Sequence, residues 1–137
     1  MKKLHVSNFD VYYEDTDASG FAYHTTYLRF AERARSSLVK DQFPELMELM
    51  IKNTFFFVVR EIKVKYLLPS FLNEKLFVET FFMENSLSSI TLVQHVLKKK
   101  KIICEIKVEL VWLNKKFGKP SRIPKNIIAR FNSFQVV

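Results

Sequence analysis

The sequence predicts an α+β fold in which an antiparallel sheet wraps around one long helix. The chain has 137 residues, which is enough for one compact domain spanning residues 1–137 and too few for two ordinary ones. One helical stripe of apolar residues comes early in the chain, and nearly everything after it alternates with the period of a β-strand. Hydrophobic residues make up 48% of the chain, which suits a packed core.

The helix is predicted from apolar residues that recur three or four positions apart: Tyr27, Ala31, Ala34 and Leu38. We expect Thr25 or Thr26 to be its N-cap and Phe43-Pro44 to end it, which gives about 15 residues and a length of about 22 Å. A short second helix is expected over residues 45–52. The first helix has one apolar stripe, so it needs an apolar surface to pack on.

Strands are predicted on both sides of this helix. Phe9, Val11 and Tyr13 alternate with polar residues and indicate a first strand. Residues 55–59 are apolar at every position, as in a strand buried on both faces, and the alternating strands that follow are residues 60–66, 76–84, 89–98 and 104–112. A loop is expected at residues 114–120 and a short closing helix at residues 124–131. Long strands with one apolar face, packed around one helix, give the hotdog architecture.

Charge and cysteine content restrict the class of protein. The net charge of +8 favours polyanionic partners such as nucleic acid, anionic lipid, an acidic acyl carrier protein or the phosphates of coenzyme A. Lys98 to Lys101 lie between two predicted strands and are expected to form a charged hairpin turn, or a patch for one of these anions. The single cysteine, Cys104, lies on the apolar face of a strand and is expected to be a core residue in a reducing compartment.

Several classes of site have no support in the sequence. No His, Cys or Asp cluster has metal-ligand spacing, and no glycine-rich phosphate loop is present, so we expect no cofactor and no metal. The N-terminus lacks the apolar core of a signal peptide, and no apolar run reaches the length of a membrane span. We therefore expect a cytoplasmic protein, with peripheral association at the inner membrane as a further option.

The segment before the helix carries the candidate chemistry. Residues 14–20 are turn formers that include three carboxylates, and His24 follows where the helix begins. Backbone N–H groups at a helix N-terminus are unpaired and can stabilise an oxyanion. A carboxylate beside them could attack a carbonyl or activate water, which is what acyl transfer to water requires.

This segment also resembles the 4-hydroxybenzoyl-CoA thioesterase family, and within it the YbgC-type enzymes associated with the Tol–Pal system. The resemblance covers about 25 residues densely: Tyr12–Gly20, Tyr23-His24, Tyr27-Leu28 and Glu32–Arg35. Two positions depart from the family pattern, with Ser19 where glycine is common and Thr26 where asparagine is common.

The resemblance implies hydrolysis of acyl-CoA thioesters, with coenzyme A entering only as part of the substrate. Asp17 would be the nucleophile or general base, His24 would place its backbone N–H at the oxyanion site, and Tyr13 would line the same pocket. Tyr27 and Arg60 are candidate substrate contacts. The family forms dimers and tetramers with sites at subunit boundaries, so a homo-oligomer is expected.

Simpler interpretations stand beside these. Asp17 could be a turn residue and His24 a structural one, whereas Glu14 and Asp15 are expected to be turn and surface groups. The rival functions are a hotdog dehydratase, a thioesterase acting on acyl carrier protein, and a non-catalytic module that binds acyl chains, a Tol–Pal partner or phospholipid-synthesis proteins. A nucleic-acid binder is disfavoured, because the aromatic residues fall on core faces. The sequence does not determine acyl chain length.

Overall fold

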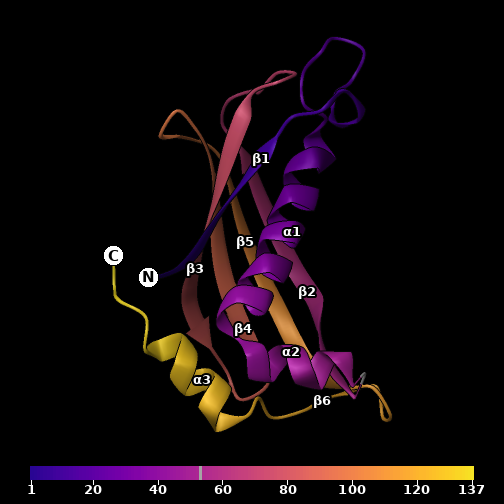
Figure 1. The fold of residues 1–137 in the computed structure, drawn as a ribbon. Coiled ribbons are helices and arrows are strands. Elements are labelled where there is room, and N and C mark those ends of the chain that lie inside the picture. Colours follow the sequence, from indigo (N-terminus) through magenta and orange to yellow (C-terminus); the bar gives the residue numbers. More distant parts are fainter. Residues whose placement is uncertain (53) are drawn as a thin grey trace.

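In the computed structural model, which describes residues 1–52 and 54–137, one curved antiparallel sheet covers a long helix. The sheet has the order β1-β3-β4-β5-β2, and α1 lies across its concave face (Figure 1). Its main strands are β1 (Lys2–Asp10), β2 (Phe55–Tyr66), β3 (Lys75–Asn85), β4 (Ser89–Lys98) and β5 (Lys101–Asn114). The two-residue β6 (Lys119–Pro120) pairs with the end of β5. The predicted hotdog fold is confirmed.

The central helix α1 (His24–Gln42) is 19 residues long, four more than expected. Its predicted stripe faces the sheet, with Tyr27, Ala31, Ala34 and Leu38 all buried. The predicted N-cap at Thr25 or Thr26 is wrong, because the helix begins at His24 with extended Tyr23 as the cap. Thr26 lies inside the first turn, where its hydroxyl donates to the Asp15 carbonyl at 2.8 Å.

The first strand also differs from the prediction. β1 begins at Lys2 and ends at Asp10, so Val11 and Tyr13 lie beyond it. The chain leaves the sheet here because the Asp15 carboxylate accepts the Tyr12 N–H at 2.9 Å and closes a 3-10 turn over Tyr13–Asp15. The free edge of β1 is covered in part at Lys2, which bridges to Val136 near the C-terminus.

Strand β2 lies at the opposite edge of the sheet. The two predicted segments, 55–59 and 60–66, are one strand with a register irregularity next to Arg60. The expectation that residues 55–59 are buried on both faces is wrong: residues 55–58 are half-buried and Val59 is 48% exposed. An edge strand has a neighbour on one side only, which leaves its apolar residues less covered.

The remaining helices close one end of the core. α2 (Pro44–Ile51) and α3 (Lys125–Asn132) follow the predicted boundaries closely. Trp112, Phe43 and Phe131 are the largest fully buried side chains of the core cluster at this end. A second core cluster lies under the first half of α1 and includes Tyr27, Phe30 and Cys104. Cys104 is fully buried as predicted, and burial raises the pKa of its thiol to about 12.

Candidate active site

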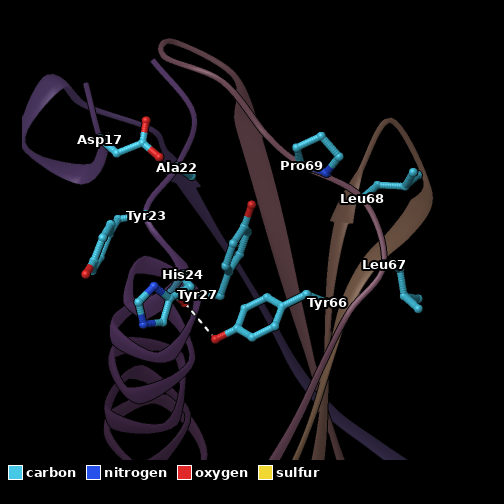
Figure 2. Close-up of a pocket in the computed structure, with 9 residues that line it drawn as sticks. All are labelled: Asp17, Ala22, Tyr23, His24, Tyr27, Tyr66, Leu67, Leu68 and Pro69. Atoms are coloured by element: carbon cyan, nitrogen blue, oxygen red, sulfur yellow. Dashed lines mark hydrogen bonds between the residues drawn. The ribbon is translucent and has the colours of Figure 1, made fainter. Parts of the chain in front are cut away.

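A pocket of about 430 Å³ opens at the N-terminal end of α1 (Figure 2). The loop before α1 forms one wall and the end of β2 forms the other. Its lining residues are Asp17, Ala22, Tyr23, His24, Tyr27, Tyr66, Leu67, Leu68 and Pro69. The pocket therefore joins two segments about 40 positions apart in the sequence.

Asp17 is held in this wall by a closed loop. Thr16 and Ala22 form an isolated antiparallel bridge, and the Asp17 N–H donates to the Phe21 carbonyl at 2.9 Å. Gly20 has φ +86°, a left-handed conformation that glycine adopts without steric cost, and its N–H donates to the Asp17 carbonyl at 3.1 Å. The loop thus fixes the backbone of Asp17 while its side chain stays exposed to the pocket.

The Asp17 carboxylate is stabilised in its ionised form by its neighbour Ser19. The Ser19 hydroxyl and the Ser19 N–H both donate to Asp17 Oδ1, the N–H at 2.8 Å. These hydrogen bonds lower the pKa of Asp17 from its ordinary value, the hydroxyl contributing most. Serine thus contributes a donor that glycine, common at this position in the family, lacks.

The first turn of α1 faces the same pocket. The Thr26 N–H donates to the Tyr23 carbonyl at 2.9 Å, whereas the His24 and Thr25 N–H groups have no protein acceptor among the described residues. The His24 ring packs against Tyr23 with ring centroids 4.4 Å apart. The Tyr66 hydroxyl donates to the His24 carbonyl at 2.9 Å, which ties the end of β2 to the start of the helix (Figure 2).

Tyr27 forms the buried floor of the pocket. Its hydroxyl shares a 2.7 Å hydrogen bond with Ser70 Oγ, and its ring centroid is 5.8 Å from that of Tyr66. Burial raises the pKa of Tyr27, so the phenol is neutral at physiological pH. Tyr27 lines the pocket, and its role as a substrate contact stays a prediction.

Asp15 is a structural residue, and the expectation that it lies on the surface is wrong. It is only 5% exposed, and its carboxylate accepts the Arg29 guanidinium at 2.8 Å as well as the Tyr12 N–H. Its carbonyl accepts the Tyr23 N–H at 2.8 Å and the Thr26 hydroxyl. Asp15 therefore connects the loop that carries Asp17 to the first turns of α1. Glu14 is exposed, as predicted.

Two predicted site residues lie outside this pocket. Tyr13 is 83% exposed in the 3-10 turn, because the turn directs its side chain into solvent. Arg60 is paired with Glu109 on neighbouring β5. Neither residue lines the pocket with Asp17 and His24.

Sequence reasoning missed the wall contributed by the end of β2. The sequence pattern assigns Tyr66 only to the end of the predicted strand 60–66, and Leu67 to Pro69 lie outside the predicted elements. The usable signal was an aromatic residue followed by Leu-Leu-Pro at a strand end, where a polar turn is more common. Which strand end meets the helix depends on the sheet order, which local periodicity does not contain.

The arrangement suits attack on a carbonyl carbon. Asp17, with its ionised carboxylate, and His24, whose backbone N–H has no protein acceptor among the described residues, line one pocket together with aromatic and aliphatic side chains. Among residues 1–52 and 54–137, no group of three or more His, Cys, Asp or Glu side chains is placed to hold a metal ion. No helix in the same part of the chain is long and apolar enough to cross a membrane.

Comparisons with known proteins agree with this chemistry. The sequence model of the thioesterase-like superfamily matches residues 11–131. The acyl-CoA thioester hydrolase YbgC of Escherichia coli O6:H1 is 34% identical over 122 residues, which cover 88% of this chain and 90% of that protein. The acyl-CoA thioesterase YbgC of Haemophilus influenzae is 31% identical, with 89% and 90% covered.

Solved structures share the fold over nearly the whole chain. A probable thioesterase from Bartonella henselae superposes with a TM-score of 0.80 at 31% identity, covering 88% of this chain and 98% of that one. A thioesterase from Thermus thermophilus, complexed with coenzyme A and Zn, superposes with a TM-score of 0.80 at 25% identity, covering 93% and 97%. The chain belongs to the thioesterase-like superfamily and is a YbgC-type thioesterase.

Proposed function

We propose that this protein hydrolyses acyl-CoA thioesters to a free acid and coenzyme A, with Asp17 as the catalytic carboxylate. The observation that carries this proposal is that Asp17, with its ionised carboxylate, and His24, the first residue of α1, line one pocket. The names of the curated relatives and the coenzyme A complex of a structural relative support the substrate class.

The thioester oxygen would lie against the His24 N–H at the start of α1, which would stabilise the negative charge that develops during attack. Asp17 then acts in one of two ways. As a general base, it removes a proton from water while the water oxygen bonds to the carbonyl carbon. As a nucleophile, it forms an anhydride with the acyl group, which water then cleaves. In both routes the C–S bond breaks, and the thiolate leaves and takes up a proton.

The reaction class is tested by thiol release from acyl-CoAs with chains from acetyl to palmitoyl, with the acid product identified by mass spectrometry. The proposal predicts stoichiometric release of coenzyme A and free acid. A 3-hydroxyacyl-CoA is included in the panel, and its conversion to an enoyl-CoA and water without thiol release would indicate a dehydratase instead. Turnover of acyl carrier protein thioesters but not of acyl-CoAs would mean that acyl carrier protein is the acyl donor. No turnover of either donor would favour an acyl-binding or Tol–Pal interaction module.

We also propose that the protein works as a homo-oligomer through the β2 edge. β2 ends the sheet and exposes apolar residues on its concave face, among them Val59, Ile62 and Tyr66. Such an edge favours pairing with a second copy. Because Tyr66 also lines the pocket, that copy would approach the active site.

Light scattering at micromolar concentration tests this proposal. We expect the mass of a dimer or tetramer, and a shift towards the monomer for Val59→Glu, which places a charge on the edge strand. A wild-type monomer would contradict the proposal.

We also propose a cytoplasmic location, which the buried, unpaired cysteine Cys104 supports because such thiols persist in reducing compartments.

A further inference from the structure

A second large hollow lies on the outer face of the sheet, away from α1. The outer hollow has a volume of about 470 Å³ and is lined by Lys3, Val6, Phe77, Glu79, Leu97, Lys99 and Lys100. An adjoining hollow of about 420 Å³ shares Phe77 and Lys99 with it. The active-site pocket has none of these residues, so the two sites are separate.

The floor of the outer hollow is apolar because three neighbouring strands direct apolar side chains outward. Phe77 on β3 pairs with Leu97 on β4, and Val6 on β1 pairs with Glu79 on β3. Val6 is 46% exposed and Phe77 is 40% exposed. The outward face of an antiparallel sheet is usually polar, and a contiguous apolar patch with a polar rim marks an interaction surface.

The rim of the outer hollow is positively charged. The two glutamates that line the hollows are each paired with a lysine, Glu79 with Lys3 and Glu74 with Lys98. Within residues 1–52 and 54–137, no carboxylate lies within 4 Å of Lys99, Lys100 or Lys101. Their charge is therefore available to a ligand.

Lys99 and Lys100 also occupy backbone positions that disfavour them. They are the two central residues of the β4–β5 hairpin, in which Lys98 pairs with Lys101. Both have positive φ, 48° for Lys99 and 66° for Lys100, as a type I′ turn requires. Asparagine and glycine are preferred at such positions, because other side chains meet a steric cost there. Two lysines in this turn suggest a role other than stability.

We propose that the outer hollow binds the surface of a bilayer that contains anionic lipids. Val6, Phe77 and Leu97 would enter the boundary between headgroups and acyl chains, and the lysine stems would extend along them to place their ammonium groups among the lipid phosphates. β3 lies between β1 and β4, so the backbone at Phe77 is hydrogen-bonded on both sides. Phe77 on β3 and Leu97 on β4 therefore offer apolar contact from strands that are hydrogen-bonded on both sides. This inference does not depend on the proposed thioesterase activity.

Vesicle co-sedimentation tests the proposal with the intact protein. Wild type is expected to bind vesicles of three parts phosphatidylcholine and one part phosphatidylglycerol, and to bind phosphatidylcholine alone at least about tenfold more weakly. The double variant Lys99→Gln/Lys100→Gln should lower binding to the anionic vesicles at least about tenfold. Phe77→Ser should lower it as well, with folding checked by circular dichroism.

The matched control is Lys115→Gln/Lys116→Gln, which removes the same charge from the turn at the other end of β5. We expect this control to bind at least about threefold more tightly than the Lys99/Lys100 variant. Equal loss in both double variants would mean that net charge alone drives binding and would overturn the proposal. So would the absence of wild-type binding, equal binding to neutral vesicles, or a Phe77→Ser variant that changes only the oligomeric mass.

Discussion

Replacing Asp15 by alanine should destabilise the protein and disorganise the active site together. The substitution removes the acceptor of the Arg29 guanidinium at 2.8 Å and of the Tyr12 N–H at 2.9 Å. The side chain of Asp15 is 7% exposed, whereas that of Arg29 is 44% exposed, so Arg29 can turn to water after the substitution. A charge-assisted hydrogen bond contributes about 1.5–3 kcal/mol, and the exposed arginine places the expected loss at about 2 kcal/mol.

Thermal unfolding followed by circular dichroism measures this loss. A change of about 2 kcal/mol in a chain of this length lowers Tm by roughly 6–8 °C. Asp15→Asn is the matched control, because it keeps an acceptor for the Tyr12 N–H and removes only the charge. Its Tm should therefore fall less than that of Asp15→Ala. Thioesterase kcat/KM should fall further than unfolding explains, since the loop carrying Asp17 loses its side-chain bond to Arg29 of α1 and keeps only the bonds to the Asp15 carbonyl. A Tm within 2 °C of wild type would refute this account of Asp15.

Three further predictions follow from named contacts. Ser19→Ala removes the hydroxyl that most lowers the pKa of Asp17; the pKa should rise, so the acid limb of kcat/KM should move to higher pH, whereas Ser19→Thr should keep it in place. Gln94→Leu removes the partner of the Ala31 carbonyl, the Thr80 hydroxyl and the Arg35 guanidinium, which all bond to the fully buried Gln94 amide. It should lower the free energy of unfolding in urea by about 2–4 kcal/mol; a change below about 1 kcal/mol would contradict this. Lys99→Asn/Lys100→Gly should raise the free energy of unfolding by about 1–2 kcal/mol, because it removes two strained side chains from a type I′ turn; a loss of stability would contradict this.

Local periodicity was sufficient to predict most of the fold. The stripe that includes Tyr27 and Leu38 identifies α1, and the alternation from Cys104 to Trp112 identifies β5 and its buried face. These patterns depend on neighbours three, four or two positions away, so they are visible in one sequence.

The errors concern contacts between distant segments. Thr25 and Thr26 are good cap residues, yet the hydroxyl of Thr26 is used by the carbonyl of Asp15, eleven positions earlier. Residues 55–59 are apolar throughout and suggest a central strand, but the sheet order places β2 at an edge. The burial of Asp15 depends on Arg29, and no spacing rule connects a turn carboxylate to that guanidinium.

The site residues divide in the same way: the residues of one continuous motif could be found from the sequence, and those from a distant strand could not. Asp17, His24 and Tyr27 lie in or next to one continuous motif, and the structure places all three around one pocket. Tyr66 reaches the pocket through the pairing of β2 with β5, where Tyr66 is opposite Cys104. That pairing is long-range information, which explains why the second wall of the pocket was missed.

The most direct test of the account compares kcat/KM for Asp17→Asn with that for wild type on the best acyl-CoA. Asp10→Asn is the control, an exposed carboxylate at the end of β1 that lies outside the pocket. We predict that kcat/KM falls about 10²–10⁴-fold in Asp17→Asn with unchanged Tm, and that Asp10→Asn keeps near wild-type activity. A folded Asp17→Asn variant that retains wild-type kcat/KM would show that Asp17 is not the catalytic carboxylate.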